Sequence, residues 1–236
     1  MRVSSLVLLT TLLGLAIVPG HALAQNMFLK SGESGFGIAA GARSADDWSS
    51  LGFVVGYSIT GFNELSLKVS KISFDKFRVA GVGSFPDVDA TAISPSVSIA
   101  VVKQSANVPL SIELGAAYEH RSFSNAMLDR YHASVSGSGF SFGGMLYVRV
   151  PAYPSLDVIP TLSITYSSMD LRGEDPYGRV AYRDDQTTTL GFGAAFAFTL
   201  AHGQVLWALP SFLTAEGKSS FGIAVGIALP TRLLER

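Results

Sequence analysis

Histidine is the side chain best suited to acid–base chemistry near neutral pH, and only four occur among the 236 residues. His120 and His132 bracket the polar segment HRSFSNAMLDRYH, in which Ser122 follows His120 by two positions. Asp184 and Asp185 form a second candidate, a pair of adjacent carboxylates. A nucleophile needs a base within hydrogen-bond reach, and the spacing demonstrates no such pair. We therefore expect no catalytic residues.

Ligands for metals, phosphates and nucleic acids are equally sparse. The segment DLRGEDPYGRVAYRDDQ is rich in carboxylates but lacks the regular spacing of a calcium loop. No glycine cluster stands between a strand and a helix as in phosphate-binding loops. The net charge of −1 shows no basic excess for binding nucleic acid. We expect no metal, no cofactor and no nucleic-acid partner.

A small set of charged residues lies on faces otherwise made of Gly, Ala, Ser and Thr, and these faces belong to segments of alternating sequence. If those faces enclose a lumen, the charges need partners or water. Arg149 and Asp157 flank the turn PAYPS symmetrically, so a hairpin predicts an ion pair between them. The other three are expected to form a second cluster. The candidate lumen charges are Glu64, Lys68, Glu113, Arg149 and Asp157.

The first 24 residues have the features of a cleaved signal peptide. Arg2 supplies an early positive charge, an apolar run follows to Val18, and Ala22-Leu23-Ala24 is a small-x-small cleavage site. The apolar run is shorter than the roughly 20 residues of a transmembrane helix. We therefore divide the chain into an exported leader, residues 1–24, and a single domain, residues 25–236. The domain contains no cysteine, so disulfides do not hold it together.

The composition resembles that of a membrane protein, although no membrane helix follows the leader. The mean hydropathy is +0.35 and charged residues make up only 15% of the chain. The apolar residues instead alternate with small ones, and a period of 2 is typical of strands. We predict about ten strands, each near the 9–11 residues that cross a bilayer at a tilt. The alternating segments are 36–43, 51–59, 64–70, 92–102, 110–119, 140–150, 156–168, 190–200, 204–213 and 219–230.

The face that is not bulky indicates which side of these strands meets lipid. A soluble β-sandwich or barrel also alternates, but its wet face usually collects Lys, Glu, Asp and Arg. Here that face is mainly Gly, Ala, Ser and Thr, whereas the bulky face is long and nearly unbroken. Lipid offers no hydrogen bonds, so strands cross it only as a closed barrel. We predict an all-β fold, a closed antiparallel transmembrane barrel of about ten strands, with eight as the alternative.

The connections between the predicted strands alternate in length. Those after the second, fourth, sixth and eighth strands are short, whereas the residues 75–89, 121–133 and 170–185 form long connections. Outer-membrane barrels have short periplasmic turns and longer external loops. An even number of strands also returns both ends of the domain to the periplasm, the side to which a signal peptide delivers the chain.

The sequence resembles bacterial outer-membrane β-barrels of the small, single-chain OmpA- and OmpX-like type. The final strand carries the sharpest likeness, a polar-x-Gly-x-x-apolar-x-apolar pattern at Ser220, Gly222, Val225 and Ile227. The resemblance implies that these residues form the signal read by the barrel-assembly machinery. It also implies a location in the outer membrane, in contact with its lipids and lipopolysaccharide.

The resemblance also bears on enzymes and on the aromatic residues. His120 with Ser122 is faintly similar to a pair in lipid A deacylases, and Asp184-Asp185 to the paired aspartates of omptin proteases, but the surrounding residues do not match. Trp48 and Tyr166 are candidates for an outer aromatic girdle, and Phe62, Tyr153 and Trp207 for a periplasmic one. Because proline removes a ladder hydrogen bond, we expect bulges or shifted strand ends at Pro95, Pro160 and Pro210.

These observations favour a protein that is not an enzyme. The many small residues predicted to face the lumen suggest a narrow passive pore for small solutes. A charge network that only satisfies itself suggests a structural membrane component instead. The alternative is a surface adhesion or ligand-binding barrel that acts through its long external connections, and an outer-membrane lipid A deacylase or protease is less favoured. Permeant, ligand and oligomeric state are left open by the sequence.

Overall fold

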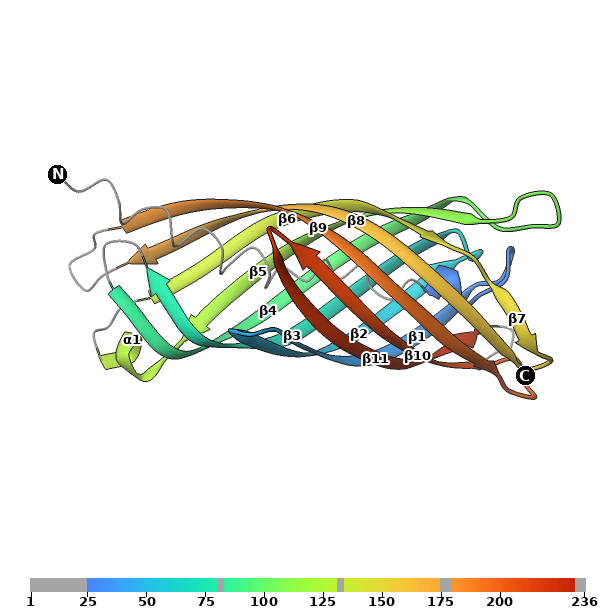
Figure 1. The fold of residues 1–236 in the computed structure, drawn as a ribbon, viewed down its shortest axis with the longest axis horizontal. Coiled ribbons are helices and arrows are strands. Elements are labelled where there is room, and N and C mark those ends of the chain that lie inside the picture. The colour runs from blue at the N-terminus through green and yellow to red at the C-terminus, as the bar shows by residue number, and fades with distance from the viewer. Residues whose placement is uncertain (1–24, 80–82, 131–133, 175–179, 232–236) are drawn as a thin grey trace.

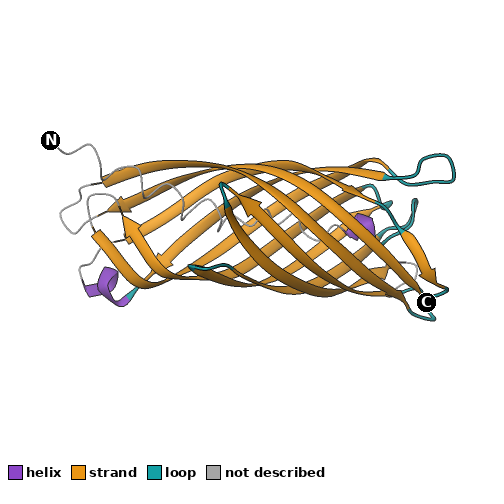
Figure 2. Ribbon diagram, in the orientation of Figure 1, coloured by secondary structure: helices purple, strands orange, loops and turns teal. Residues whose placement is uncertain are grey.

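The computed structural model describes residues 25–79, 83–130, 134–174 and 180–231, and strands make up most of them (Figures 1 and 2). The predicted leader, residues 1–24, lies outside the described residues. No helix in the described ranges combines the length and apolarity needed to cross a membrane. The short helical elements are a 3-10 turn at Gln25–Met27 and α1 (Ala126–Arg130). The strands are β1 (Gly35–Ser44), β2 (Trp48–Ile59), β3 (Asn63–Val79), β4 (Gly83–Val102), β5 (Ser111–Ser124), β6 (Ser134–Tyr147), β7 (Val150–Tyr153), β8 (Leu156–Glu174), β9 (Val180–Thr199), β10 (Val205–Ala215) and β11 (Lys218–Pro230).

The strands close into a single antiparallel barrel in which chain neighbours pair and β1 pairs with β11. β6 and β7 both pair with β8 and are separated only by residues 148 and 149. They therefore form one crossing, and the barrel has ten crossings, as predicted from the sequence. Gly35 pairs with Pro230, so the domain starts and ends on the same side. We call this the periplasmic end and the opposite side the outer end.

Burial alternates along the strands and confirms the predicted orientation. On β2, Leu51 is 65% exposed and Phe53 and Val55 are also exposed, whereas Gly52, Val54 and Gly56 face inward. The final strand behaves in the same way, with Phe221, Ile223 and Val225 outside. The bulky side chains form a continuous apolar exterior that only hydrocarbon can cover. The small residues line the interior.

Towards the outer end, the outward face changes from apolar to polar on each strand. On β9 the outward residues Phe196, Phe192 and Leu190 give way to Thr188 and Gln186. The same change occurs on the other strands, so the apolar band has a defined upper limit. Its first polar residues are Ser44, Ser49, Lys71, Thr91, His120, Ser138, Ser168, Thr188, Thr214 and Ser219.

Above this limit the strands continue, which corrects the predicted external loops. Most of the described residues of the long connections 75–89 and 170–185 are strand, whereas the connection 121–133 contains the end of β5 and α1. β3 pairs with β4 as far as Val79 and Gly83, and β8 pairs with β9 as far as Glu174 and Val180. These hairpins remain ordered because an inward apolar core continues beyond the band, where the outward face is already polar.

The prediction of bulges or shifted strand ends at the three prolines was wrong, since all three lie within β4, β8 and β10. Pro95 pairs with Leu67, Pro160 with Ala194 and Pro210 with Ile223, each in an unshifted register. Each proline has no pair in the ladder with its second neighbouring strand. The missing pairs lie between β4 and β5 at Pro95, between β8 and the break that separates β6 from β7 at Pro160, and between β10 and β9 at Pro210. A missing N–H therefore removes ladder bonds on one side without displacing the strand.

Candidate functional site: the barrel interior

The barrel interior is divided into three layers along its axis. An apolar cluster fills the outer end, polar and charged side chains form a middle belt, and a second apolar cluster fills the periplasmic end. Any solute that crossed the barrel would have to pass all three layers. We therefore take the interior as the candidate functional site.

The outer cluster is built by residues from most of the strands and capped by a helix. Trp48 on β2 is 2% exposed, and Phe74 on β3 stacks on Phe123 of β5 with ring centroids 6.2 Å apart. Leu128 of α1 is buried against the same cluster. Its remaining members are Ile72, Val88, Ala90, Ala92, Val135, Met169, Leu171 and Ala215. Because most of these residues belong to strands, the outer seal is part of the barrel wall.

In the middle belt, Arg43 reaches inward from β1 towards β10 and β11. Its Nη2 donates to Ser211 Oγ at 2.8 Å and its Nη1 to Ser220 Oγ at 3.3 Å. A Cβ at Gly222 would lie 2.9 Å from Arg43 Cζ, so this glycine makes room for the guanidinium. Arg43 was not among the predicted lumen charges, although it alternates with the bulky residues of β1.

Lys68 lies in the same belt, which corrects the predicted cluster of Glu64, Lys68 and Glu113. The charged groups that act on Lys68 are Glu119, Arg121 and Arg43. Lys68 pairs with Ser94, and the Ser94 hydroxyl donates to Glu119 Oε2 at 2.9 Å. Glu64 stands four residues away along β3, about 13 Å in a strand. Strand register thus separates residues that the sequence pattern placed on one face.

Glu119 and Arg121 of β5 form an ion pair in the belt. Arg121 Nε donates to Glu119 Oε1, and both side chains are buried. Thr165 and Ser167 of β8 and Thr187 of β9 are also buried. Sequence reasoning did not name this pair. Arg121 lies beyond the predicted segment 110–119, and Glu119, the last residue of that segment, was not counted among the lumen charges although the alternation places it on the small-residue face.

At the periplasmic end, the N-terminal segment enters the barrel mouth. Asn26 is completely buried and links β2, β3 and the turn between them. Its backbone N–H donates to Glu64 Oε2 at 3.3 Å, its Nδ2 donates to the Phe62 carbonyl at 3.2 Å, and Ser58 Oγ donates to its Oδ1 at 2.5 Å. We call residues 26–29 the N-terminal plug, because Met27, Phe28 and Leu29 are also buried.

The plug packs against Trp207, which is not a girdle residue. Phe28 and Trp207 stack with centroids 4.8 Å apart and an interplanar angle of 8°. Gly226, the cross-strand partner of Trp207, has space only for hydrogen, because a Cβ there would lie 2.4 Å from Trp207 Cζ2. Trp48 likewise faces inward, so both tryptophans seal the interior. Tyr153, in contrast, is highly exposed on the outside.

Lys103, in the turn after β4, ties the plug to the barrel rim. Its Nζ donates to the Leu29 carbonyl at 2.8 Å and to the Gly61 carbonyl at 2.6 Å, and it lies over the Phe62 ring. Burial, followed by repulsion from Arg149, lowers the pKa of Lys103 to about 8. At pH 7 the amine is therefore still mostly charged.

The predicted ion pair between Arg149 and Asp157 is present. Arg149 Nε lies 3.4 Å from Asp157 Oδ2, and both side chains are partly exposed at the periplasmic mouth. Arg149 Nη2 also donates to the Met27 carbonyl at 2.7 Å, so the residue holds the plug as well as its partner. Glu64 and Glu113 lie at the same end and contact Asn26.

The residues of the predicted insertion signal divide between the two faces of β11. Ser220 and Gly222 face inward and accommodate Arg43, whereas Val225 and Ile227 point outward. Packing inside the barrel therefore gives the polar residue and the glycine a structural role. Recognition by the assembly machinery remains a prediction.

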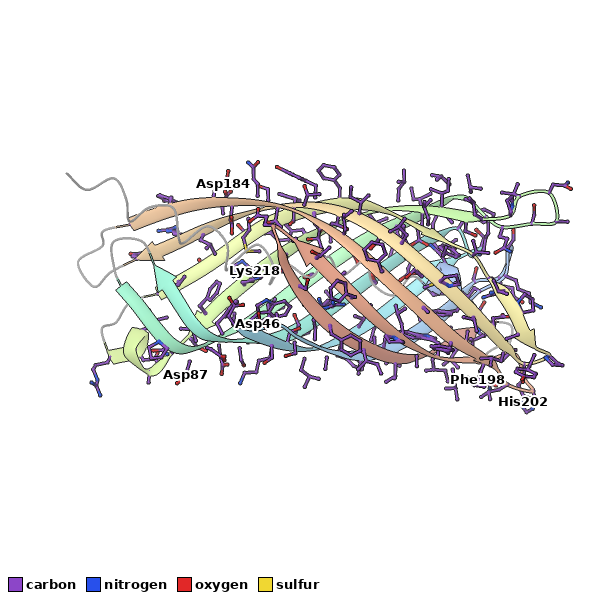
Figure 3. The ribbon with its side chains drawn as sticks, in the orientation of Figure 1. Asp46, Asp87, Asp184, Phe198, His202 and Lys218 are labelled. Atoms are coloured by element: carbon purple, nitrogen blue, oxygen red, sulfur yellow. The ribbon has the colours of Figure 1, made fainter. Side chains whose placement is uncertain are left out.

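The candidate catalytic residues are not brought together. His120 and Ser122 both lie on the outer wall of β5, two residues apart, which separates side chains by about 6.6 Å. Asp184 is exposed and Asp185 is buried, because successive strand residues face opposite sides. Figure 3 places Asp87 and Asp184 towards one end of the barrel and His202 at the other. Within the described ranges no group of side chains suited to a metal ion occurs.

Comparisons with known proteins agree with this architecture. No known protein family and no curated protein matches the sequence. The translocator domain of the autotransporter NalP from Neisseria meningitidis is similar, with 12% identity, a TM-score of 0.55 and coverage of 88% of this chain and 91% of that one. Ail, the attachment invasion locus protein of Yersinia pestis, has 10% identity, a TM-score of 0.41 and coverages of 85% and 99%. LpxR from Salmonella typhimurium has 9% identity, a TM-score of 0.42 and coverages of 82% and 99%.

The likeness to the NalP translocator domain concerns the fold, which is that of the bacterial outer-membrane β-barrels. The apolar exterior independently indicates a barrel that spans a membrane, because a closed barrel with such a band is stable only in a bilayer. The chain is thus an integral outer-membrane barrel of ten crossings.

Proposed function

We propose that the protein is a non-enzymatic structural component of the outer membrane, whose barrel is sealed to small solutes at rest. The observation that supports this most directly is the filling of the interior at both ends. Phe28 and Trp48 are each 2% exposed, although they lie at opposite mouths. A passive pore needs a continuous water-filled path. Here the outer mouth of the barrel is filled by side chains of the barrel wall itself.

The middle belt fits a structural role as well as it fits a pore. Arg43 donates to two serines, and Glu119 accepts hydrogen bonds from Ser94 and Arg121. A buried polar network whose members satisfy one another stabilises one arrangement of the wall. The predicted partners follow from this proposal: the lipids and lipopolysaccharide of the outer membrane, and the barrel-assembly machinery during insertion.

The non-enzymatic part of the proposal is supported by the separation of the candidate groups. His120 and Ser122 point outward without reaching each other, and Asp184 and Asp185 lie on opposite faces of β9. A base must approach its nucleophile to within about 3 Å. Neither the deacylase-like nor the omptin-like pair meets that requirement.

The conductance of the purified barrel in a planar lipid bilayer tests the proposal. We expect the folded wild-type chain to be silent, and a chain that lacks residues 26–29 to remain silent because the outer cluster is intact. Discrete conductance steps should appear only when that deletion is combined with Trp48→Ala and Phe74→Ala. Steps from the wild-type chain would contradict the proposal.

The second candidate is binding at the cell surface through the outer hairpins. β8 has 19 residues and β9 has 20, whereas about 9–11 residues cross a bilayer. Many outward residues beyond the band are polar, among them Asp170, Asp184 and the ion pair of Arg172 with Glu174 at 3.2 Å. This surface is suited to polar or charged partners, such as lipopolysaccharide head groups.

A further inference from the structure

The hairpin of β8 and β9 extends past the hairpin of β10 and β11 and leaves one edge of β9 open (Figure 1). β9 pairs with β8 as far as Val180, whereas its ladder with β10 ends where Leu190 meets Thr214. Among the described residues, none pairs with residues 180–189 on the side of β10. At about 3.3 Å per residue, this open edge is about 33 Å long.

Two backbone hydrogen bonds near the periplasmic end of β9 determine which residues face this edge. The N–H of Thr199 donates to the Ser155 carbonyl, on the side of β8, and the N–H of Leu200 donates to the Gln204 carbonyl, on the side of β10. Because the register of β9 with β8 is unshifted, odd-numbered residues bond to β8 and even-numbered residues face the other way. The residues whose N–H and C=O groups point to the open edge are therefore Tyr182, Asp184, Gln186 and Thr188.

The open edge begins where the apolar band ends. Leu190 is the last bulky outward residue of the band on β9 and also the last residue paired with β10, whereas Thr188 is the first polar one. Lipid offers no hydrogen bonds to an open edge, so this edge is tolerated because it stands above the hydrocarbon. Unpaired edges are templates for another strand unless proline, a bulge or charge blocks them. Residues 180–189 contain no proline and pair with β8 without a bulge, so charge is what selects the partner.

The outward face beside the open edge carries negative charge. Asp184 lies directly opposite Asp170 of β8, and both side chains are exposed. Neither makes an ion pair with a described residue, and Arg172, two residues from Asp170, pairs with Glu174 instead. Like charges directly opposite each other destabilise a sheet. A basic side chain on an added strand would therefore relieve a repulsion as well as gain an attraction.

A second copy of this chain does not fit the edge. It would bring Asp184 next to another acidic edge. Two barrels related by an axis along the membrane normal would also cross their tilted strands instead of laying them side by side.

We propose that the open edge of β9 from Tyr182 to Thr188 binds an extended, basic polypeptide segment of a partner protein, which adds as a further strand. Main-chain hydrogen bonds hold the segment, and Lys or Arg at every second position faces Asp184 and Asp170. The inference rests on the second candidate function, binding through the outer hairpins, and specifies its partner. It does not depend on whether the lumen conducts.

Hydrogen exchange of single amides, measured by NMR on the barrel in lipid nanodiscs, tests the edge itself. Without a partner, the amides of Asp184 and Gln186 should exchange about tenfold or more faster than those of Asp185 and Thr187, which bond to β8. The probe is a peptide of about eight residues in which Lys and Thr alternate. Its addition should slow exchange at Asp184 and Gln186 by about tenfold and leave Asp185 and Thr187 unchanged.

Gln186→Pro tests the main-chain bonds, because it removes one edge-facing N–H from a residue that makes no ladder bond to β8. We expect it to weaken binding of the probe peptide about tenfold. The matched variant Gln186→Thr removes the same side chain but keeps the N–H, and it should bind as the wild type does. Asp184→Asn with Asp170→Asn should weaken binding about threefold and reduce its dependence on salt. Circular dichroism confirms the barrel in each variant, and a probe peptide methylated at its backbone nitrogens repeats the first test on the unaltered chain.

Three results would overturn the proposal. Equal exchange of neighbouring amides in the free barrel would show that the edge is not open. Undiminished binding of the methylated peptide would show that charge alone attracts the probe. Protection of Asp184 and Gln186 that rises with the number of barrels in a nanodisc, without peptide, would assign the edge to a second copy. None of these results bears on the sealed lumen, which the conductance measurement tests separately.

Discussion

Trp48→Ala should lower the free energy of unfolding by about 3–5 kcal/mol, the usual cost of removing a buried tryptophan. Trp48 is the largest side chain of the outer cluster, and it packs there with Phe74 and Phe123. Because the surrounding residues are held by strand pairing, they cannot collapse into the cavity. Urea unfolding of the barrel in detergent, followed by circular dichroism, measures the change.

Ser49→Ala provides the matched control, since Ser49 is the next residue along β2 and faces outward above the apolar band. We expect its effect to stay within about 0.5 kcal/mol, as for most surface substitutions. If Trp48→Ala were equally mild, Trp48 would not be part of a packed outer seal, and the assignment of this cluster would be wrong.

Gly226→Val should have the second large effect, because it removes the space that Trp207 occupies. An added Cβ would lie 2.4 Å from Trp207 Cζ2 and 2.6 Å from the Ile38 carbonyl oxygen, and the backbone contact cannot move away easily. Overpacking of this kind typically costs about 1–3 kcal/mol. Displacing Trp207 also breaks its stack with Phe28, so we expect a loss of about 3 kcal/mol and faster proteolysis of the plug.

A double variant separates the steric cause from a general loss of stability. Trp207→Ala removes the ring that collides with the new side chain, so Gly226→Val with Trp207→Ala should be less destabilised than the sum of the two single variants. Ala40→Val, which places a valine on the outward face of β1, should change stability little. Additive effects of the two single variants would contradict the proposed contact.

The strands and their orientation could be predicted because both depend on local alternation. A period of 2 identifies a strand, and the scarcity of charge on the small face identifies the side that meets lipid. Hairpin connectivity then places neighbours together, which is why the pairing of Arg149 with Asp157 was found. Long-range register was not accessible in this way, so Lys68 was grouped with Glu64 and Glu113 rather than with Glu119.

The filling of the lumen was harder to predict, because composition alone suggested empty space. Gly222 and Gly226 are small because Arg43 and Trp207 occupy the volume beside them. Trp48 is an even number of residues away from the inward-facing residues of β2, so it also faces inward. It lies before residues 51–59, the segment whose alternation predicts a strand. The plug has no periodic signal, since residues 26–29 follow the predicted leader directly and form no strand.

The accessibility of a single cysteine in the middle belt tests the sealed lumen most directly. The chain has no cysteine of its own, so each substitution reports alone. Ser96 faces the lumen between the two apolar clusters, whereas Ser122 is exposed on the outer wall above the band. A water-soluble maleimide that does not cross lipid should label Ser122→Cys readily and leave Ser96→Cys essentially unmodified in the folded, reconstituted barrel. Labelling of Ser96→Cys at the rate of Ser122→Cys would show that water reaches the belt freely and would contradict a barrel closed at both ends.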